Sequence, residues 1–289
     1  MSLRNMQNVL ARILTDDNLR ETFLRNPEII SQENELTWRE QESLRNLDQE
    51  RLVIYADGLK GGRIALVLQA FPLMKFLASK EIRGFTDVYC RQSPPLSAIS
   101  MSPMYHEVLK FYRFFAPLAA SGKLASKYAR DILEYEYNIC VIGNSVEASK
   151  SAIAFAEAKP ALPEDFTWEM IRYLKPRTGS HSIITKFDYD VVELISHLVN
   201  QELPDLEPKI TYLLFFKKTD QRGVRKNKIT KATADLLSLC DGAESIEVTI
   251  SNLTSKYGIT SNLGKERLAG GCLSILRELY KSTVITFEN

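Results

Sequence analysis

The side chains that most often bind metal ions or act as nucleophiles are few in this chain and lie far apart. Its three histidines, His106, His181 and His197, have no second metal ligand one helical turn away. The four cysteines, which form no Cys-x-x-Cys pair and stand in apolar surroundings, are Cys90, Cys140, Cys240 and Cys272. Zinc and redox sites usually depend on closely spaced ligands. We therefore expect buried, reduced thiols, no bound metal and no cofactor.

The motifs of common enzyme classes are missing from the sequence. It contains no dinucleotide-binding Gly-x-Gly-x-x-Gly, no phosphate-binding loop and no Gly-x-Ser-x-Gly. Asp188 and Asp190 share a face only in an extended segment, and we interpret Asp188 as a helix N-cap rather than an acid–base residue. We therefore expect no catalytic residues and a protein that is not an enzyme.

Positive charge concentrates on two expected strands and the turn between them. The six basic residues there are Lys217, Lys218, Arg222, Arg225, Lys226 and Lys228. Such a surface would steer an acidic or amphipathic peptide toward the strands. Lysine and arginine also protect an exposed strand edge from aggregation, so both interpretations stay open.

Two glycines, Gly270 and Gly271, stand inside the last expected helix. Glycine costs about 1 kcal/mol relative to alanine in a helix interior, so the pair needs a reason. Close approach of a peptide backbone is one reason, and packing of the helix against a sheet is the other.

The last third of the chain is expected to fold as a sheet followed by helices. β-Branched and aromatic residues predict strands over 182–187 and 210–216, and a turn at 220–223 leads to a strand over 224–229. Apolar spacing then predicts helices over 232–239, 246–257 and 264–281, and a short strand over 284–287. Asp241 and Gly242 are expected to end the first of these helices.

The first half of the sequence predicts helices. The segment Thr15-Asp16-Asp17 is expected to cap one helix start and Asp48 another, and Thr37 with Glu40 forms a capping-box pattern. Glycines at 58, 61 and 62 are expected to interrupt a helix, and Pro72 to kink the next one.

One helix of this half carries an unusual number of aromatic residues, namely Phe111, Tyr112, Phe114 and Phe115. Aromatic side chains of this size fill a core, or they anchor a protein interface. The sequence leaves both uses open.

The segment 228–242 runs from a strand through a polar turn into a helix that ends at Cys240, Asp241 and Gly242. Together with the later helices and strand, residues 209–289 resemble the small PqqD-like family, also called RiPP recognition elements. The resemblance implies a winged-helix-like fold that binds the leader of a ribosomally made precursor peptide as an added strand. Segments 19–27, 94–95, 111–114 and 187–190 are similar to partner proteins of multinuclear non-heme iron enzymes of the methanobactin and thia-amino-acid type.

This resemblance places the peptide between the strand 224–229 and the helix 268–279. The peptide-binding residues expected there are Val224, Arg225, Lys226, Asn227, Lys228, Leu268, Gly271, Cys272 and Ile275. A proline at Asn227 is expected to weaken binding if the N–H of that residue is one of the donors.

We therefore expect a fold that is mainly α with a small β component. It would comprise a helical partner-docking domain (1–160), a connecting strand–helix segment (161–208) behind a proline-containing linker, and a winged-helix-like recognition domain (209–289). The expected function is that of a noncatalytic partner protein, which presents the precursor peptide to an iron-dependent modifying enzyme.

The alternative is a winged-helix DNA-binding regulator. The net charge of +1 and the mixed charges of the last helix disfavour nucleic acid as a partner. No apolar run reaches transmembrane length and the first residues lack a secretory signal, so we expect no membrane contact and a cytoplasmic location.

Overall fold

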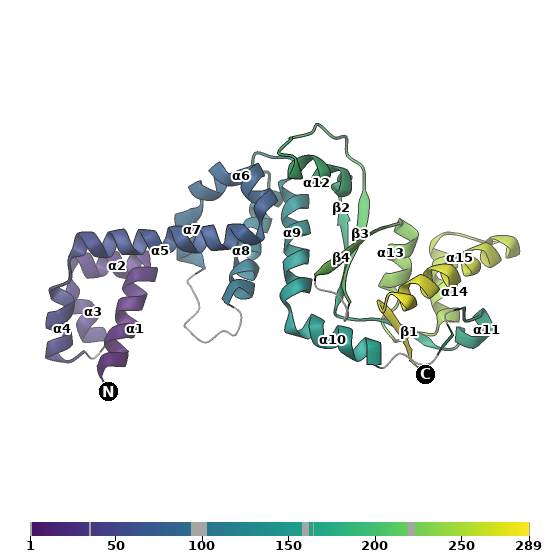
Figure 1. Ribbon diagram of the computed structural model, residues 1–289, viewed down its shortest axis with the longest axis horizontal. Coiled ribbons are helices and arrows are strands. Elements are labelled where there is room, and N and C mark those ends of the chain that lie inside the picture. Colours follow the sequence, from purple (N-terminus) through teal and green to yellow (C-terminus); the bar gives the residue numbers. More distant parts are fainter. Residues whose placement is uncertain are drawn as a thin grey trace. The chain divides into compact units, whose positions relative to one another are not determined.

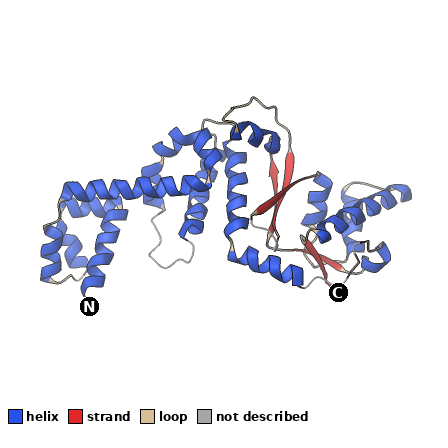
Figure 2. Cartoon of the chain, viewed as in Figure 1, coloured by secondary structure: helices blue, strands red, loops and turns tan. Residues whose placement is uncertain are grey.

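The computed structural model is mainly helical with a small sheet component, as the sequence predicts (Figures 1 and 2). The chain forms two compact units, residues 1–134 and 135–289. The residues that the structure describes are 2–34, 36–93, 103–157, 162–163, 165–218 and 223–288. Half of the expected proline-containing linker at 160–165 and most of the expected turn at 220–223 lie outside these ranges. Within them, no helix is long and apolar enough to cross a membrane.

The described residues of the first unit form helices and their connections. The helices are α1 (Ser2–Thr15), α2 (Asp17–Arg25), α3 (Pro27–Glu33), α4 (Trp38–Arg45), α5 (Gln49–Ala70), α6 (Pro72–Gly84), α7 (Thr86–Gln92), α8 (Pro103–Ala120) and the first part of α9 (Ala129–Asn144). Helices α1 to α4 pack around a small apolar core that includes the fully buried Ile13 and Leu44.

Helix starts in this unit confirm the predicted caps. The Asp16 carboxylate accepts hydrogen bonds at the start of α2, and the Asp48 carboxylate accepts from the Arg51 N–H at 3.1 Å. At the start of α4, the Glu40 carboxylate accepts from the Thr37 N–H at 2.8 Å. These bonds satisfy donors that the first turn of a helix otherwise leaves unpaired.

Helix α5 runs without a break over 22 residues, so the predicted interruption by glycines is wrong. Gly58, Gly61 and Gly62 each face open space, since a Cβ there would meet no atom within 4 Å. Packing of the opposite side, including the buried Val67, stabilises the helix against the glycine cost. Pro72 does not kink a helix but begins α6, where its missing N–H has no partner to lose.

The aromatic residues of α8 mainly fill the core. Phe111 and Phe115 are fully buried, and the Phe111 ring centroid lies 4.8 Å from that of Phe71 and 5.9 Å from that of Tyr89. Phe114 is half-buried and stacks edge-on against Tyr89. Phe111 and Phe115 are therefore core residues, which excludes them as interface anchors.

A buried ionic network joins α5, α7 and α8. Arg63 Nε donates to Glu107 Oε2 at 2.6 Å, and the Tyr89 hydroxyl donates to the same oxygen at 3.2 Å. The side chains of Arg63 and Glu107 are only 12% and 11% exposed. Burial raises the pKa of Tyr89 well above its ordinary value. Lys110 Nζ lies 3.6 Å from the other Glu107 oxygen and its side chain is 20% exposed, so every member of the network is largely buried.

The second unit packs helices around two small antiparallel sheets (Figure 2). Its elements are the rest of α9, α10 (Val146–Glu157), α11 (Trp168–Ile171), β1 (Lys175–Thr178), β2 (Ser182–Phe187), α12 (Val191–Val199), β3 (Thr211–Lys217), β4 (Val224–Ile229), α13 (Lys231–Ser238), α14 (Ile246–Lys256), α15 (Asn262–Lys281) and β5 (Ile285–Glu288). The strands predicted over 182–187 and 224–229 are confirmed, and the other predicted elements of this part form within three residues of their expected limits.

The larger sheet has the order β2-β3-β4 and is covered on both faces. Leu214 and Phe216 of β3 join the apolar core formed with α13, α14 and α15. Phe215, between them, points the other way and lies 5.7 Å from the Tyr135 ring of α9. Alternating side chains thus bury both faces, which explains why β3 is a continuous apolar run.

The smaller sheet pairs β1 with β5, with Lys175 opposite Glu288. Strand β1 was not predicted, because four residues that include Pro176 carry no strand pattern. Together β1 and β2 give the segment 161–208 one strand in each sheet, so it is not a separate connector. The unit boundary at 134/135 also differs from the expected boundary at 160.

Two predicted helix limits are shifted. Helix α13 ends at Ser238, and Gly242 follows in a left-handed conformation with φ of 83°. The Gly242 N–H donates to the Pro176 carbonyl at 2.9 Å, so this glycine joins the helix to β1 rather than ending the helix. Helix α12 begins at Val191, with Asp190 and not Asp188 at the N-cap position.

Candidate peptide-binding site

Strand β4 is an edge strand: in the described part of the chain, only β3 pairs with it. Four consecutive residues, Arg225, Lys226, Asn227 and Lys228, are exposed, and Val224 at the start of the strand is half-buried. Exposed edges of this length can accept another strand. The five β4 residues expected to bind a peptide therefore lie together on one accessible strand.

The direction of the backbone groups in β4 follows from the pairing of β3. The Lys217 N–H of β3 donates to the His181 carbonyl at 3.0 Å, toward β2. Backbone groups alternate sides along an antiparallel strand, and the residue opposite Asn227 is three before Lys217. The backbone of Asn227 is therefore directed at β3, whereas the N–H and C=O groups of Lys226 and Lys228 point to the open edge.

This alternation corrects the expected role of Asn227. Its N–H belongs to the ladder with Leu214 and is not available to a peptide. A proline at this position would disrupt the sheet itself. The donors available for an added strand are those of Lys226 and Lys228.

The side chains of Lys226 and Lys228 lie on the face of the sheet that α9 and α12 cover. Lys226 Nζ donates to the Tyr135 hydroxyl at 3.0 Å and lies 5.5 Å from the centre of the Tyr135 ring. Lys228 Nζ donates to Asp190 Oδ2 at 2.7 Å. Both ammonium groups are thus held beside the edge strand.

Asp190 is the centre of an ionic cluster at one end of β4. Its Oδ2 also accepts from Lys209 Nζ at 2.9 Å. The side chain of Asp190 is 8% exposed, whereas those of Lys209 and Lys228 are 66% and 49% exposed. The hydrogen bond from Lys228, followed by that from Lys209, outweighs burial and lowers the pKa of Asp190 to about 2. The Oδ1 atom is buried and has no hydrogen-bond partner within the described ranges.

The four expected residues of α15 are in different environments. Cys272 is 4% exposed and belongs to the apolar core, which removes it from the accessible surface. Leu268 and Ile275 are half-buried and pack against the same core as Ile229 of β4. Gly271 is exposed, and a Cβ there would meet no atom within 4 Å. Helix-to-sheet packing is therefore not the reason for this glycine.

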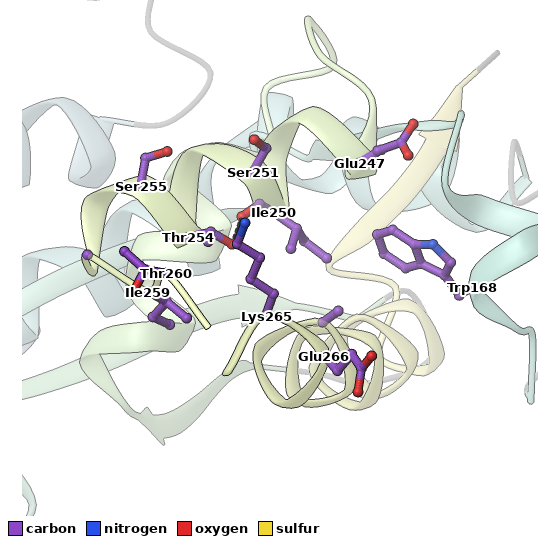
Figure 3. Close-up of a pocket in the computed structure, with 12 residues that line it drawn as sticks. Trp168, Glu247, Ile250, Ser251, Thr254, Ser255, Ile259, Thr260, Lys265 and Glu266 are labelled. Atoms are coloured by element: carbon purple, nitrogen blue, oxygen red, sulfur yellow. Dashed lines mark hydrogen bonds between the residues drawn. The ribbon is translucent and has the colours of Figure 1, made fainter. Parts of the chain in front are cut away.

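A groove of about 740 Å³ lies between α14 and α15, with Trp168 at one end (Figure 3). Thr254 and Ile250 of α14 face Lys265 across it. With 3.6 residues per turn, this flank of α15 is opposite to the side that carries Gly271. No pattern in the sequence indicates the groove, because its lining combines residues of α11, α14 and α15.

The cysteines are all buried, as expected, and are not paired in disulfides. Burial raises the pKa of Cys240 to about 12 and that of Cys272 to about 11, which keeps both thiols protonated. Among the residues that the structure describes, no cluster of three His, Cys, Asp or Glu side chains is placed to hold a metal ion.

His181 is fully buried and bridges three segments. One ring nitrogen, Nδ1, lies 3.1 Å from Ser151 Oγ, and Nε2 lies 2.8 Å from the Thr283 carbonyl oxygen. A Cβ at Gly179 would overlap the ring, so glycine is required beside it. Burial lowers the pKa of His181, so the ring stays neutral near pH 7 and acts as a structural link.

Arg277 is one of the basic residues of α15. Its Nε donates to the Phe166 carbonyl at 2.9 Å, and Nη2 donates to the Asp165 carbonyl at 3.1 Å. This guanidinium therefore fixes the segment before α11, which engages donors that a phosphate group would otherwise use.

Comparison of the sequence with models of protein families and with curated proteins found no match.

Proposed function

We propose that this protein is a noncatalytic partner protein that binds the leader of a ribosomally made precursor peptide. An extended segment of the leader adds as a strand at the open edge of β4. The exposure of this edge, from Arg225 to Lys228, is the observation that carries the proposal. A row of outward N–H and C=O groups is a template for another strand. The resemblance of residues 209–289 to PqqD-like domains supports the same use.

Paired proline and alanine variants test this proposal. Proline at position 226 removes an outward N–H, which an edge strand tolerates, so Lys226→Pro should fold and lose peptide binding. Lys226→Ala removes the same side chain but keeps the N–H, and should bind the peptide more weakly than the wild type without losing it. The assay is fluorescence anisotropy with a labelled leader peptide from a neighbouring precursor gene.

Equal binding by folded Lys226→Pro and Lys226→Ala would exclude strand addition at this edge. A labelled DNA duplex in the same assay separates the alternative function. A DNA-binding regulator would bind the duplex with an affinity that falls steeply with salt. A peptide-binding protein would bind the leader peptide and not the duplex.

The second part of the proposal is a protein partner, an iron-dependent modifying enzyme of the class that the resemblance implies. Helix α5 supports a docking role, because Ile54 and Tyr55 are each 68% exposed and Leu59 is 51% exposed. Large exposed apolar side chains mark protein interfaces. This moves the docking surface from the aromatic residues of α8 to α5.

Co-purification with the enzyme from a neighbouring gene tests the α5 surface. The double variant Tyr55→Ser and Leu59→Ser should lose the complex while its leader binding stays at the wild-type level. A complex that survives this double change places the docking surface elsewhere.

A further inference from the structure

Lys226 and Lys228 define what an added strand would meet at the edge of β4. Their backbone groups point outward, so residues of an added strand pair directly opposite them. Residues that pair across a sheet place their side chains on the same face. Since Lys226 and Lys228 are two residues apart, their partners are also two residues apart, in a parallel or an antiparallel added strand.

The charge on that face is positive and only partly neutralised. Lys209, Lys226 and Lys228 contribute three ammonium groups, and the cluster holds one buried carboxylate, Asp190, which gives 3 − 1 = +2. Glu193, which also acts on Lys209, reduces the balance to +1. The face therefore keeps an excess of positive charge beside the open edge.

The two edge lysines keep donors available for a second partner. Lys226 Nζ donates to the Tyr135 hydroxyl, an uncharged acceptor, so its charge is not compensated there. Lys228 Nζ donates to Asp190, and about half of its side chain (49%) is exposed. An ammonium group has three donors, so each contact leaves capacity for a carboxylate.

We propose that the edge of β4 selects an acidic extended segment with two carboxylates at alternate positions, Asp/Glu-x-Asp/Glu, one opposite Lys226 and one opposite Lys228. This inference rests on the proposed strand addition and specifies its substrate class. The residue between the two carboxylates points to the other face, where Asn227 and Ile229 lie, and needs no charge. The selected segment is recognised by its negative charge and by the two-residue spacing of its carboxylates.

Two synthetic peptides of identical composition test the spacing. They share an alternating threonine and valine background with two aspartates, separated by one residue in the first peptide and adjacent in the second. Cross-strand charge pairs are individually weak, so the first peptide should bind about five-fold more tightly at low salt. A third peptide, with asparagine at both positions, measures strand addition without charge.

A charge exchange tests the contact itself. Lys226→Glu should weaken the alternating aspartate peptide, and a peptide with lysine in place of the one aspartate that pairs with position 226 should regain affinity on this variant, because its other aspartate still faces Lys228. Lys226→Pro, which blocks the edge, should abolish binding of every peptide.

Each remaining outcome overturns a defined part of the inference. If the three peptides bind equally to the wild type and do not bind to Lys226→Pro, strand addition at this edge is retained and acidic selection is refuted. Equal binding of the two aspartate peptides, tighter than that of the asparagine peptide, would show general attraction and refute the spacing. Binding of an aspartate peptide that persists in Lys226→Pro would place acidic recognition elsewhere. If no peptide binds, the inference and the strand-addition proposal both fail.

Discussion

Two ionic networks, one in each unit, pair the same kinds of groups in opposite settings. In the first unit, Arg63 and Glu107 are both nearly buried, and Tyr89 and the largely buried Lys110 complete a closed set. In the second unit, Asp190 is buried but its partners Lys209 and Lys228 are half-exposed or more. A closed network can only stabilise the fold, whereas an open one also presents charge to a ligand. Burial of both partners, rather than charge alone, separates the two roles.

The largest expected effect is on the closed network. Glu107→Ala should reduce the free energy of unfolding of the first unit by about 3–5 kcal/mol, because it leaves the Arg63 guanidinium buried without its counter-charge. Urea denaturation followed by far-ultraviolet circular dichroism measures the loss. In a Trp38→Phe background, Trp168 fluorescence reports the second unit, whose transition should stay in place.

A smaller effect is expected from the open cluster. Asp190→Ala should cost about 1–2 kcal/mol, less than Glu107→Ala, because Lys209 and Lys228 remain solvated when their shared carboxylate is removed. Trp168 fluorescence in the same Trp38→Phe background follows this change. A loss as large as that of Glu107→Ala would show that the distinction between closed and open networks does not hold.

The pH dependence of Asp190 sharpens the comparison further. Its pKa in the folded chain is lowered from 3.8 to about 2, so its ionised form stabilises the fold above pH 4. That stability is lost as pH falls from about 4 to about 2, where the folded state must also take up the proton. Asp190→Asn should therefore lose less stability than the wild type over this interval, as followed by Trp168 fluorescence. Identical profiles would contradict the lowered pKa.

The smallest expected effects are those of glycine substitutions that lie away from the ionic network of each unit. Gly62→Ala in α5 and Gly271→Ala in α15 should each stabilise their helix by about 0.5–1 kcal/mol, because alanine loses less backbone entropy and meets no neighbouring atom. Thermal unfolding with the same probes checks both. A destabilising Gly62→Ala would show that the first-unit helix does not tolerate a Cβ on its open face.

The sequence predicted those features that depend on a few neighbouring residues. The capping box at Thr37 and Glu40 and the limits of β4 follow from local hydrogen bonding and composition, and both are confirmed. Strand β1 was missed because its pairing with β5 joins Lys175 to Glu288, far along the chain. Local pattern carries no information about such a partner.

The candidate site was also predictable only where it depends on neighbouring residues. The basic strand from Arg225 to Lys228 is visible in the sequence, but the direction of each N–H depends on the register with β3. Asp190 is another example, since its partners Lys209 and Lys228 lie 19 and 38 residues away. Only the folded chain shows that one buried carboxylate holds both lysines.

The pairing of β1 with β5 also has a consequence for synthesis of the chain. Helices α1 to α8 belong to the first unit, residues 1–134, which can pack while later residues are still being added. The second unit cannot complete its smaller sheet until Ile285–Glu288 has left the ribosome, because β1 waits for that strand. During this interval β1 lacks its strand partner, and its unpaired edge is open to pairing with other strands.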